Sequence, residues 1–256
     1  LRKLGHEVCI NNGEADIAVF SQPMANAPEI AVGAKEQGAK IFTDICDDHL
    51  THPLLGPLYS KMIELSDQII CPTANMAERV YRVSGKTPVV VPDPYEEALQ
   101  EPHANGEKLL WFGHIVNVKD LQPWKPALNG IRICTGPKPQ VKDKPHKHLS
   151  TNGNNWQDNY IEWTPQAQTE ELSNANIVVI PNRRGAEYKT PNRLLNSVRA
   201  GCFVLAGGSP SHDEFRKMVW VGDLKAGLDW ARAFRDELSD RVKEAQSYIE
   251  KYSPEA

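Results

Sequence analysis

Four cationic side chains gather in one loop of the second half of the chain: Arg183, Arg184, Lys189 and Arg193. An apolar run at residues 177–180 precedes this loop, a helical segment follows it from Pro191, and a second apolar run covers residues 202–206. The order strand, loop, helix, strand indicates a parallel crossover with the loop at the carboxyl end of a strand. Open α/β sheets bind ligands at that edge, where helix N-termini attract anions. The cations therefore predict a phosphorylated small-molecule ligand.

The start of this helix carries the best candidates for contact with a phosphate. Pro191 and Asn192 mark the helix start, and Lys189 and Arg193 flank it. Cations there would stabilise the negative charge that grows on a diphosphate leaving group. The alternative interpretation is a solvated basic loop.

A second group of polar side chains follows the strand predicted at residues 40–43: Asp44, Asp47, Asp48 and His49. Carboxylates and an imidazole at a strand end could position or deprotonate an acceptor hydroxyl, which makes Asp47, Asp48 and His49 candidate catalytic residues. Two alternatives stay open. Asp44 or Asp47 could cap the next helix, or the group could bind a divalent metal.

The elements that position these residues alternate between strand and helix along the whole chain, which predicts parallel sheets with helices on both faces. A polar, proline-containing stretch at residues 92–106 interrupts the alternation. We therefore expect two doubly wound, Rossmann-like α/β domains, residues 1–104 and 105–256, which face a cleft. Residues 136–155 are rich in Pro, Lys, His, Asn and Gly and predict a long exposed loop.

Composition favours an ordinary globular protein: 40% of the 256 residues are hydrophobic and 24% are charged. Residues 1–104 hold 8 basic and 15 acidic side chains, whereas residues 105–256 hold 21 and 18. The second domain would therefore attract an anion, but this balance argues against a nucleic-acid partner. Five scattered cysteines without a CxxC pair predict buried, reduced thiols and a cytoplasmic location.

Four segments resemble motifs of retaining, group 4-like glycosyltransferases of the GT-B fold, and they occur in that family's order: residues 66–73, 89–93, 110–119 and 176–208. The similarity runs from about Leu4 to Phe215 and implies that the second domain holds a nucleoside-diphosphate sugar. It also implies catalysis without a cofactor or bound metal. Because the chain begins inside a helical pattern, the family's first glycine-rich loop is expected to lie upstream of Leu1.

The resemblance assigns further donor-binding residues. His114 and Lys119 stand where the family has a basic pair at the pyrophosphate, and Gly113 would let the backbone approach a phosphate. The alternative is an ordinary strand-to-helix turn.

The family's pair of glutamates, which hold sugar and ribose, is replaced here by Tyr188 and Asn196. Asn196 could still hydrogen-bond a ribose hydroxyl, although more weakly than a carboxylate. Glu187 could replace the first glutamate, or it could be an exposed loop acid.

The leading interpretation is transfer of a sugar from a nucleoside diphosphate to an acceptor hydroxyl, with retention at the anomeric carbon. The acceptor could be a sugar, a lipid or a protein, and peripheral membrane association stays open. Three rivals remain: a sugar-nucleotide 2-epimerase, a non-catalytic sugar-nucleotide binding module, and an unrelated sensor of phosphorylated ligands. The missing glutamate pair favours the binding module.

Overall fold

The computed structural model describes residues 7–8, 15–136, 159–182 and 187–254. The chain forms two compact units, Leu1–Pro92 (unit 1) and Asp93–Ala256 (unit 2). Most of the long loop predicted at residues 136–155 lies outside the described residues.

The division between the units falls earlier than the boundary expected after residue 104. The reason is that the polar stretch hydrogen-bonds within unit 2. The backbone N–H of Tyr95 donates to the Tyr252 carbonyl at 3.3 Å, and that of His103 donates to the Gly201 carbonyl at 3.0 Å. The stretch is therefore part of unit 2 rather than a free linker.

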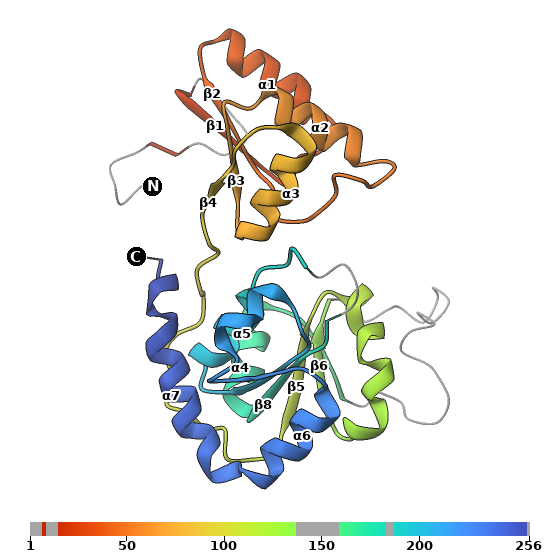
Figure 1. Cartoon of the computed structure of the whole chain (residues 1–256), viewed down its shortest axis with the longest axis vertical. Helices are drawn as coiled ribbons and strands as arrows, with labels where there is room; N and C mark the ends of the chain where they lie inside the picture. Colours follow the sequence, from red (N-terminus) through yellow and green to blue (C-terminus); the bar gives the residue numbers. More distant parts are fainter. Residues whose placement is uncertain (1–6, 9–14, 137–158, 183–186, 255–256) are drawn as a thin grey trace. The chain divides into compact units, whose positions relative to one another are not determined.

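Unit 1 is a parallel sheet in the order β1-β2-β3-β4, with helices between its strands (Figure 1). Its elements are β1 (Ile17–Ser21), α1 (Ala27–Glu36), β2 (Lys40–Asp44), α2 (Gly56–Leu65), β3 (Gln68–Cys71), α3 (Ala74–Ser84) and β4 (Val89–Val90). The predicted cap of α3 is confirmed, since the Thr73 hydroxyl accepts the backbone N–H of Met76 at 3.1 Å.

The described helices of unit 1 cover one face of its sheet. Each crossover steps in the same direction along the sheet, and right-handed crossovers then put every helix on the same side. Met62 of α2 packs on Ile41 of β2 in the core of that side. On the opposite face Ile17 and Val19 are 52% and 55% exposed. In the described residues of unit 1 the opposite face of the sheet is thus not covered by a helix.

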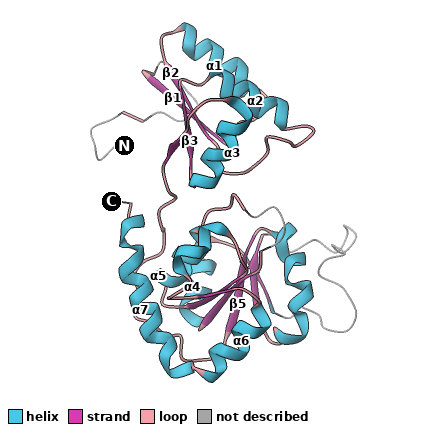
Figure 2. Cartoon of the chain, in the orientation of Figure 1, coloured by secondary structure: helices cyan, strands magenta, loops and turns pink. Residues whose placement is uncertain are grey.

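Unit 2 is a six-stranded parallel sheet in the order β10-β9-β8-β5-β6-β7 (Figures 1 and 2). Its strands are β5 (Leu109–Gly113), β6 (Arg132–Thr135), β7 (Tyr160–Glu162), β8 (Ile177–Ile180), β9 (Phe203–Ala206) and β10 (Trp220–Val221). Its α-helices are α4 (Pro165–Asn174), α5 (Asn192–Arg199), α6 (Leu224–Ala233) and α7 (Leu238–Tyr248). Its 3₁₀ segments are η2 (Ile115–Ala127), η4 (Pro210–Phe215), η5 (Arg235–Glu237) and η6 (Ile249–Tyr252).

The sheet of unit 2 is doubly wound and has a core on each face. From β5 the chain moves outward to β6 and β7, then returns to the other side of β5 with β8. Val178 of β8 lies in the core that α4, α5 and α7 build, whereas Val179 lies in the core that η2 and α6 build. Both faces of this sheet are therefore buried, as is usual for parallel sheets.

The segment that follows β5 differs from the sequence prediction. The segment after β5 forms the 3₁₀ helix η2, which the sequence did not predict because Pro123 and Pro126 interrupt its pattern.

Cys71, Cys134 and Cys202 are buried free thiols, as predicted for cysteines in apolar runs. Burial raises the pKa of Cys71 to about 12 and that of Cys134 to about 11, which keeps both protonated.

Candidate functional site

The direction of winding in unit 2 reverses between the neighbouring strands β5 and β8. Strand β5 ends at Gly113, and β8 ends at Ile180. In open α/β sheets the crevice outside the carboxyl ends of such a strand pair is the usual ligand site.

Arg193 lies at this point. It is in the first turn of α5, and its Nη1 donates to the carbonyl of Phe112 at 3.3 Å. A Cβ atom on Gly113 would lie 3.4 Å from the same Nη1. The structure therefore brings together Gly113 and Arg193, which are far apart in sequence, at the end of β5.

Gly113 is suited to this contact in two ways. Its φ of +152° is a conformation that residues with a side chain rarely adopt, and a Cβ atom would also meet the Trp111 ring at 3.3 Å. The indole N–H of the buried Trp111 has no hydrogen-bond partner among the described residues. The glycine thus leaves room for the guanidinium beside the strand end.

The Arg193 guanidinium is largely withdrawn from water. Burial lowers its pKa from the ordinary arginine value, and the charge of Asp120 acts in the opposite direction. Arginine stays protonated despite such a shift. A cation with a reduced hydration shell gains more from an anionic ligand than a fully solvated one.

The carboxyl edge beside Arg193 is completed by Asn182, Gly207 and His212. The side-chain amide of Asn182, after β8, donates to the Gly207 carbonyl, after β9, at 3.0 Å. Nδ1 of His212, in η4, lies 3.2 Å from the same carbonyl. A Cβ atom on Gly207 would lie 2.6 Å from the Asn182 backbone nitrogen. The Gly207-Gly208 pair after the second apolar run was the available sequence signal for this close approach.

His114 and Lys119 both follow β5, but their side chains are exposed. Nδ1 of His114 accepts the backbone N–H of Val116 at 3.4 Å at the start of η2. His114 thus has a local structural contact at the start of η2.

The loop before α5 is described only in part. Arg183 and Arg184 lie outside the described residues, and Glu187 and Lys189 are exposed. Pro191 occupies the N-cap position, and the Asn192 side chain accepts the Arg193 backbone N–H at 2.7 Å. Pro191 and Asn192 therefore fix the start of α5, and with it the origin of the Arg193 side chain.

Asn196 is buried and already bound to the backbone of the polar stretch. Its Oδ1 accepts the backbone N–H of Glu96 at 2.8 Å and that of Glu97 at 3.4 Å. The carboxylate of Glu97 in turn accepts hydrogen bonds from Gln168 and Thr169 of α4. Oδ1 of Asn196 is the atom expected to bind a ribose hydroxyl. Here it holds the polar stretch at residues 92–106 against the rest of unit 2.

In unit 1 the acidic candidate residues after β2 differ in the contacts that they make. Asp48 forms an ion pair with Arg79 of α3 at 3.2 Å, and its other oxygen accepts the backbone N–H of Leu50 at 3.2 Å. Asp48 therefore stabilises the turn after β2. From the sequence, a structural role as a helix cap was expected of Asp44 or Asp47 instead.

Asp47 and His49 lie near Tyr59 of α2. The His49 and Tyr59 rings meet edge-on with centroids 5.4 Å apart. The pKa of Tyr59 is raised by burial and then by the charge of Asp47. Asp44 binds the Ser21 hydroxyl at 2.9 Å at the neighbouring strand end. In the described parts of the chain no three His, Cys, Asp or Glu side chains are placed to hold a metal.

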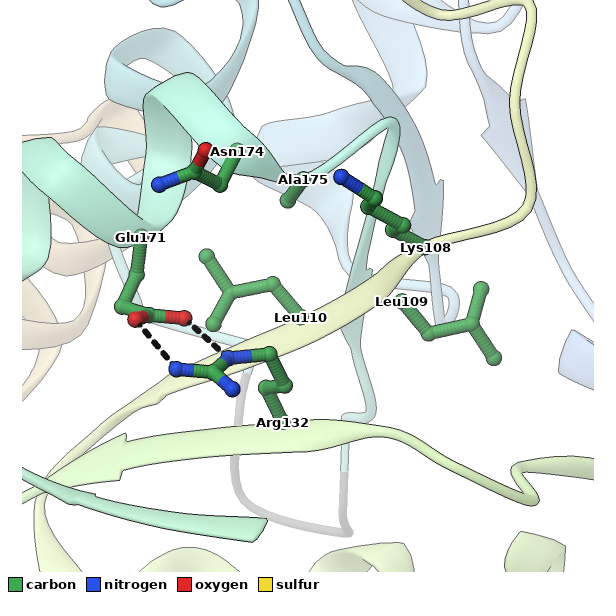
Figure 3. A pocket seen from close by; sticks show the side chains of 7 residues that line it. All are labelled: Lys108, Leu109, Leu110, Arg132, Glu171, Asn174 and Ala175. Atoms are coloured by element: carbon green, nitrogen blue, oxygen red, sulfur yellow. Dashed lines mark hydrogen bonds and ion pairs between the residues drawn. The ribbon is translucent and has the colours of Figure 1, made fainter.

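A separate cavity of about 280 Å³ lies at the amino edge of the unit 2 sheet (Figure 3). Arg132 and Glu171 point toward each other across it and form a two-bond ion pair at 2.5 and 2.6 Å. That pair raises the pKa of Arg132. None of the predicted site residues lines this cavity, and its ionic groups already satisfy each other.

Comparison with solved structures shows the fold. The chain is similar to TarM (TM-score 0.61, 15% identity, 93% of this chain and 52% of that one). It is similar to HepE of Anabaena in complex with UDP (TM-score 0.67, 9% identity, 91% and 74%). An α-glucosyltransferase in complex with UDP-glucose and DNA with an abasic site also matches (TM-score 0.56, 10% identity, 93% and 77%).

These structures show that the chain has the GT-B fold, with two Rossmann-like parallel sheets, which confirms the predicted fold class. The chain spans about half the length of TarM. No family model matches the sequence, and neither does any curated protein. None of the helices in the described residues has the length and apolar character needed to cross a membrane.

Proposed function

We propose that this chain is part of a glycosyltransferase that moves a sugar from a nucleoside-diphosphate donor to an acceptor hydroxyl. The observation that carries the proposal is the meeting of the Arg193 guanidinium with Gly113 at the reversal point of the unit 2 sheet. A diphosphate at that point would lie beside a desolvated cation and the amino end of α5, which is a strong combination for binding anions. Because HepE binds UDP and the α-glucosyltransferase binds UDP-glucose, a UDP-sugar is the first donor to test.

The chemistry assigned to Arg193 is stabilisation of the leaving group. As the bond from the anomeric carbon to the diphosphate breaks, negative charge grows on the phosphate oxygen, and a fixed guanidinium lowers the energy of that transition state. Lys119, Lys189 and His114, which are exposed near the same edge, would add hydrogen bonds or charge to the bound diphosphate. Glu187 would contact the sugar. The proposed reaction retains stereochemistry and uses no metal or other cofactor.

The acceptor side of the proposal rests on unit 1. Asp47 and His49 are the candidates to orient or deprotonate the acceptor hydroxyl, with Tyr59 packed against His49. Asp48 is the weaker third candidate, because Arg79 and the Leu50 backbone already bind one of its oxygens each. A screen of sugar, lipid and protein acceptors identifies the chemical class of the acceptor.

The proposal can be tested by thermal unfolding in the presence of UDP, UDP-glucose and other nucleoside diphosphates and their sugar conjugates. A ligand that binds the folded state raises the melting temperature as its concentration rises. Arg193→Ala should abolish this rise and leave the unliganded melting temperature almost unchanged. Arg232→Ala is the matched control, since Arg232 is an exposed arginine of α6 in the same unit.

A second function, a sugar-nucleotide binding module without catalysis, is favoured by Asn196. Its Oδ1 is held by backbone amides, and no glutamate stands at that position. Donor binding without release of nucleoside diphosphate, across a broad panel of acceptors, would support this alternative over transfer. Saturable binding that persists in Arg193→Ala would contradict both functions at this site.

A further inference from the structure

His212 is the one buried histidine among the described residues of unit 2, with 4% of its surface exposed. It sits in η4, beside the carboxyl ends of β8 and β9. Its Nδ1 lies 3.2 Å from the Gly207 carbonyl and 3.4 Å from the Asn182 side-chain nitrogen. The imidazole therefore belongs to the same strand edge as Arg193, although the proposed reaction gives it no role.

The shorter of the two Nδ1 contacts of His212, that with the Gly207 carbonyl, favours one tautomer. A carbonyl oxygen can only accept, so the contact with Gly207 is a hydrogen bond only when Nδ1 carries the proton. The Asn182 amide nitrogen donates to the same carbonyl at 3.0 Å. Nε2 is therefore the nitrogen that can gain a second proton.

Burial is the main influence on the pKa of His212, and it favours the neutral imidazole. Burial lowers its pKa, and the charge of Arg193 on α5 lowers it further. The hydrogen bond to Gly207 and the charge of Asp213, its neighbour in η4, act in the opposite direction but do not prevail. Asp213 also forms an ion pair with Arg216, which weakens its influence on the imidazole.

We propose that His212 is a positioning residue of the donor site and that it takes up one proton from water at Nε2 when a nucleoside-diphosphate sugar binds beside Arg193. The inference rests on the proposed function. Two phosphate charges next to the guanidinium would cancel its repulsion of an imidazolium and attract the new charge. The proton returns to water when the diphosphate leaves. Through Gly207 and Asn182, His212 thus couples the ends of β8 and β9 to the occupied site.

Proton uptake makes the affinity for the donor depend on pH in a defined direction. Binding becomes tighter as the pH falls, by up to about tenfold per pH unit between the pKa of His212 in the free protein and that in the complex. Above both pKa values the affinity no longer depends on this group. A residue that only packs the strand edge would give no such dependence.

The experiment is calorimetric titration of UDP-glucose into the protein in buffers with different ionisation enthalpies, over a series of pH values around neutrality. UDP-glucose is the probe because both phosphates are linked on two sides and do not titrate in this range, unlike the terminal phosphate of UDP. His212→Asn keeps a donor for the Gly207 carbonyl but cannot be protonated. His103→Gln is the control, since Nε2 of His103 also contacts a backbone carbonyl, that of Ala200 at 2.8 Å.

The expected result is a net uptake approaching one proton for the wild type and His103→Gln, and none for His212→Asn. An NMR titration of the wild-type imidazole, which needs no variant, should show its pKa rising when UDP-glucose is added. Binding without proton uptake, or with the same uptake in His212→Asn, would overturn this inference and leave the proposed function standing. Absence of any binding by the wild type would overturn the proposed function and this inference together.

Discussion

Unit 1 and unit 2 are both parallel sheets with helical crossovers, but they differ in burial and in the charges at their carboxyl edges. In unit 2 the strand order reverses at β5, and cores form on both faces. In unit 1 the order runs one way, and Ile17, Val19 and Val89 remain exposed on one face. Unit 2 has a desolvated arginine at its edge, whereas unit 1 has a group of carboxylates. The reversal of winding thus goes together with a sheet that is buried on both faces and has Arg193 at its carboxyl edge.

The largest expected effect comes from placing a lysine in each sheet, at a buried position in unit 2 and at an exposed position in unit 1. Val179→Lys places an unpaired ammonium in the fully buried centre of β8 and should destabilise unit 2 by about 4 kcal/mol or more. Val19→Lys, on the exposed face of β1, should change the stability of unit 1 by less than about 0.5 kcal/mol. All six tryptophans lie in unit 2, so their fluorescence follows its urea unfolding, and hydrogen exchange follows unit 1. Equal destabilisation by both lysines would show that the exposed face of β1 is packed in solution.

The next effect tests the room that Gly113 leaves at the donor edge. Gly113→Ala should cost about 1–3 kcal/mol of stability, because its φ of +152° is strained for alanine and its Cβ would press on Trp111 and Arg193. It should also weaken binding of UDP-glucose about tenfold, a loss of about 1.4 kcal/mol. Gly208→Ala is the control at the same edge, since a Cβ there meets no atom within 4 Å. Unchanged affinity in Gly113→Ala would separate this glycine from the donor site.

A third variant asks whether Asp48 is structural. Asp48→Ala removes the partner of the partly buried Arg79 and should destabilise unit 1 by about 1–3 kcal/mol. Hydrogen exchange should rise in α3, whereas exchange in unit 2 should stay the same. Glu36→Ala, at the exposed end of α1, serves as the control and should have little effect. If Asp48→Ala left α3 protected, the ion pair would contribute nothing to the fold.

The smallest effect concerns Glu214, which joins η4 to the C-terminal helices. Its carboxylate accepts hydrogen bonds from Lys251 at 2.5 Å, from Tyr248 at 2.8 Å and from Tyr252. Burial raises the pKa of Glu214, but these hydrogen bonds outweigh it, so the folded-state pKa lies below the ordinary value. The stabilisation is therefore present above the unfolded-state pKa and is lost as the pH falls through the folded-state pKa.

Glu214→Gln should lower the stability of unit 2 by about 1 kcal/mol near neutral pH, as expected for loss of one charged hydrogen-bond acceptor. The difference from wild type should shrink in acid, where Glu214 itself becomes protonated. Urea unfolding at a series of pH values measures this. A difference that grows in acid would mean that the pKa of Glu214 is raised rather than lowered.

The sequence predicted the alternating fold well, because its signals are local. Thr73 capped the expected helix, and the apolar runs at β8 and β9 were found with nearly correct bounds. The helix start near Pro191 was also foreseeable, since proline and asparagine are typical of the first positions of a helix.

The parts that were missed depend on contacts between distant segments. His212 and Asn182 meet through the Gly207 carbonyl, and Asn196 binds the backbone at Glu96, a hundred residues away. Asp48 could not be separated from its neighbours without knowing that Arg79 approaches it. The periodicity of the sequence assigns such residues to helices and strands. Their hydrogen-bond and ion-pair partners are set by the tertiary fold.

A structure of the complex with UDP-glucose tests the central claim most directly. We expect a diphosphate oxygen within about 2.7–3.2 Å of the Arg193 guanidinium, at the carboxyl end of β5 beside Gly113. Density for the ligand at the amino edge near Arg132, or a diphosphate bound without any contact to Arg193, would contradict the account.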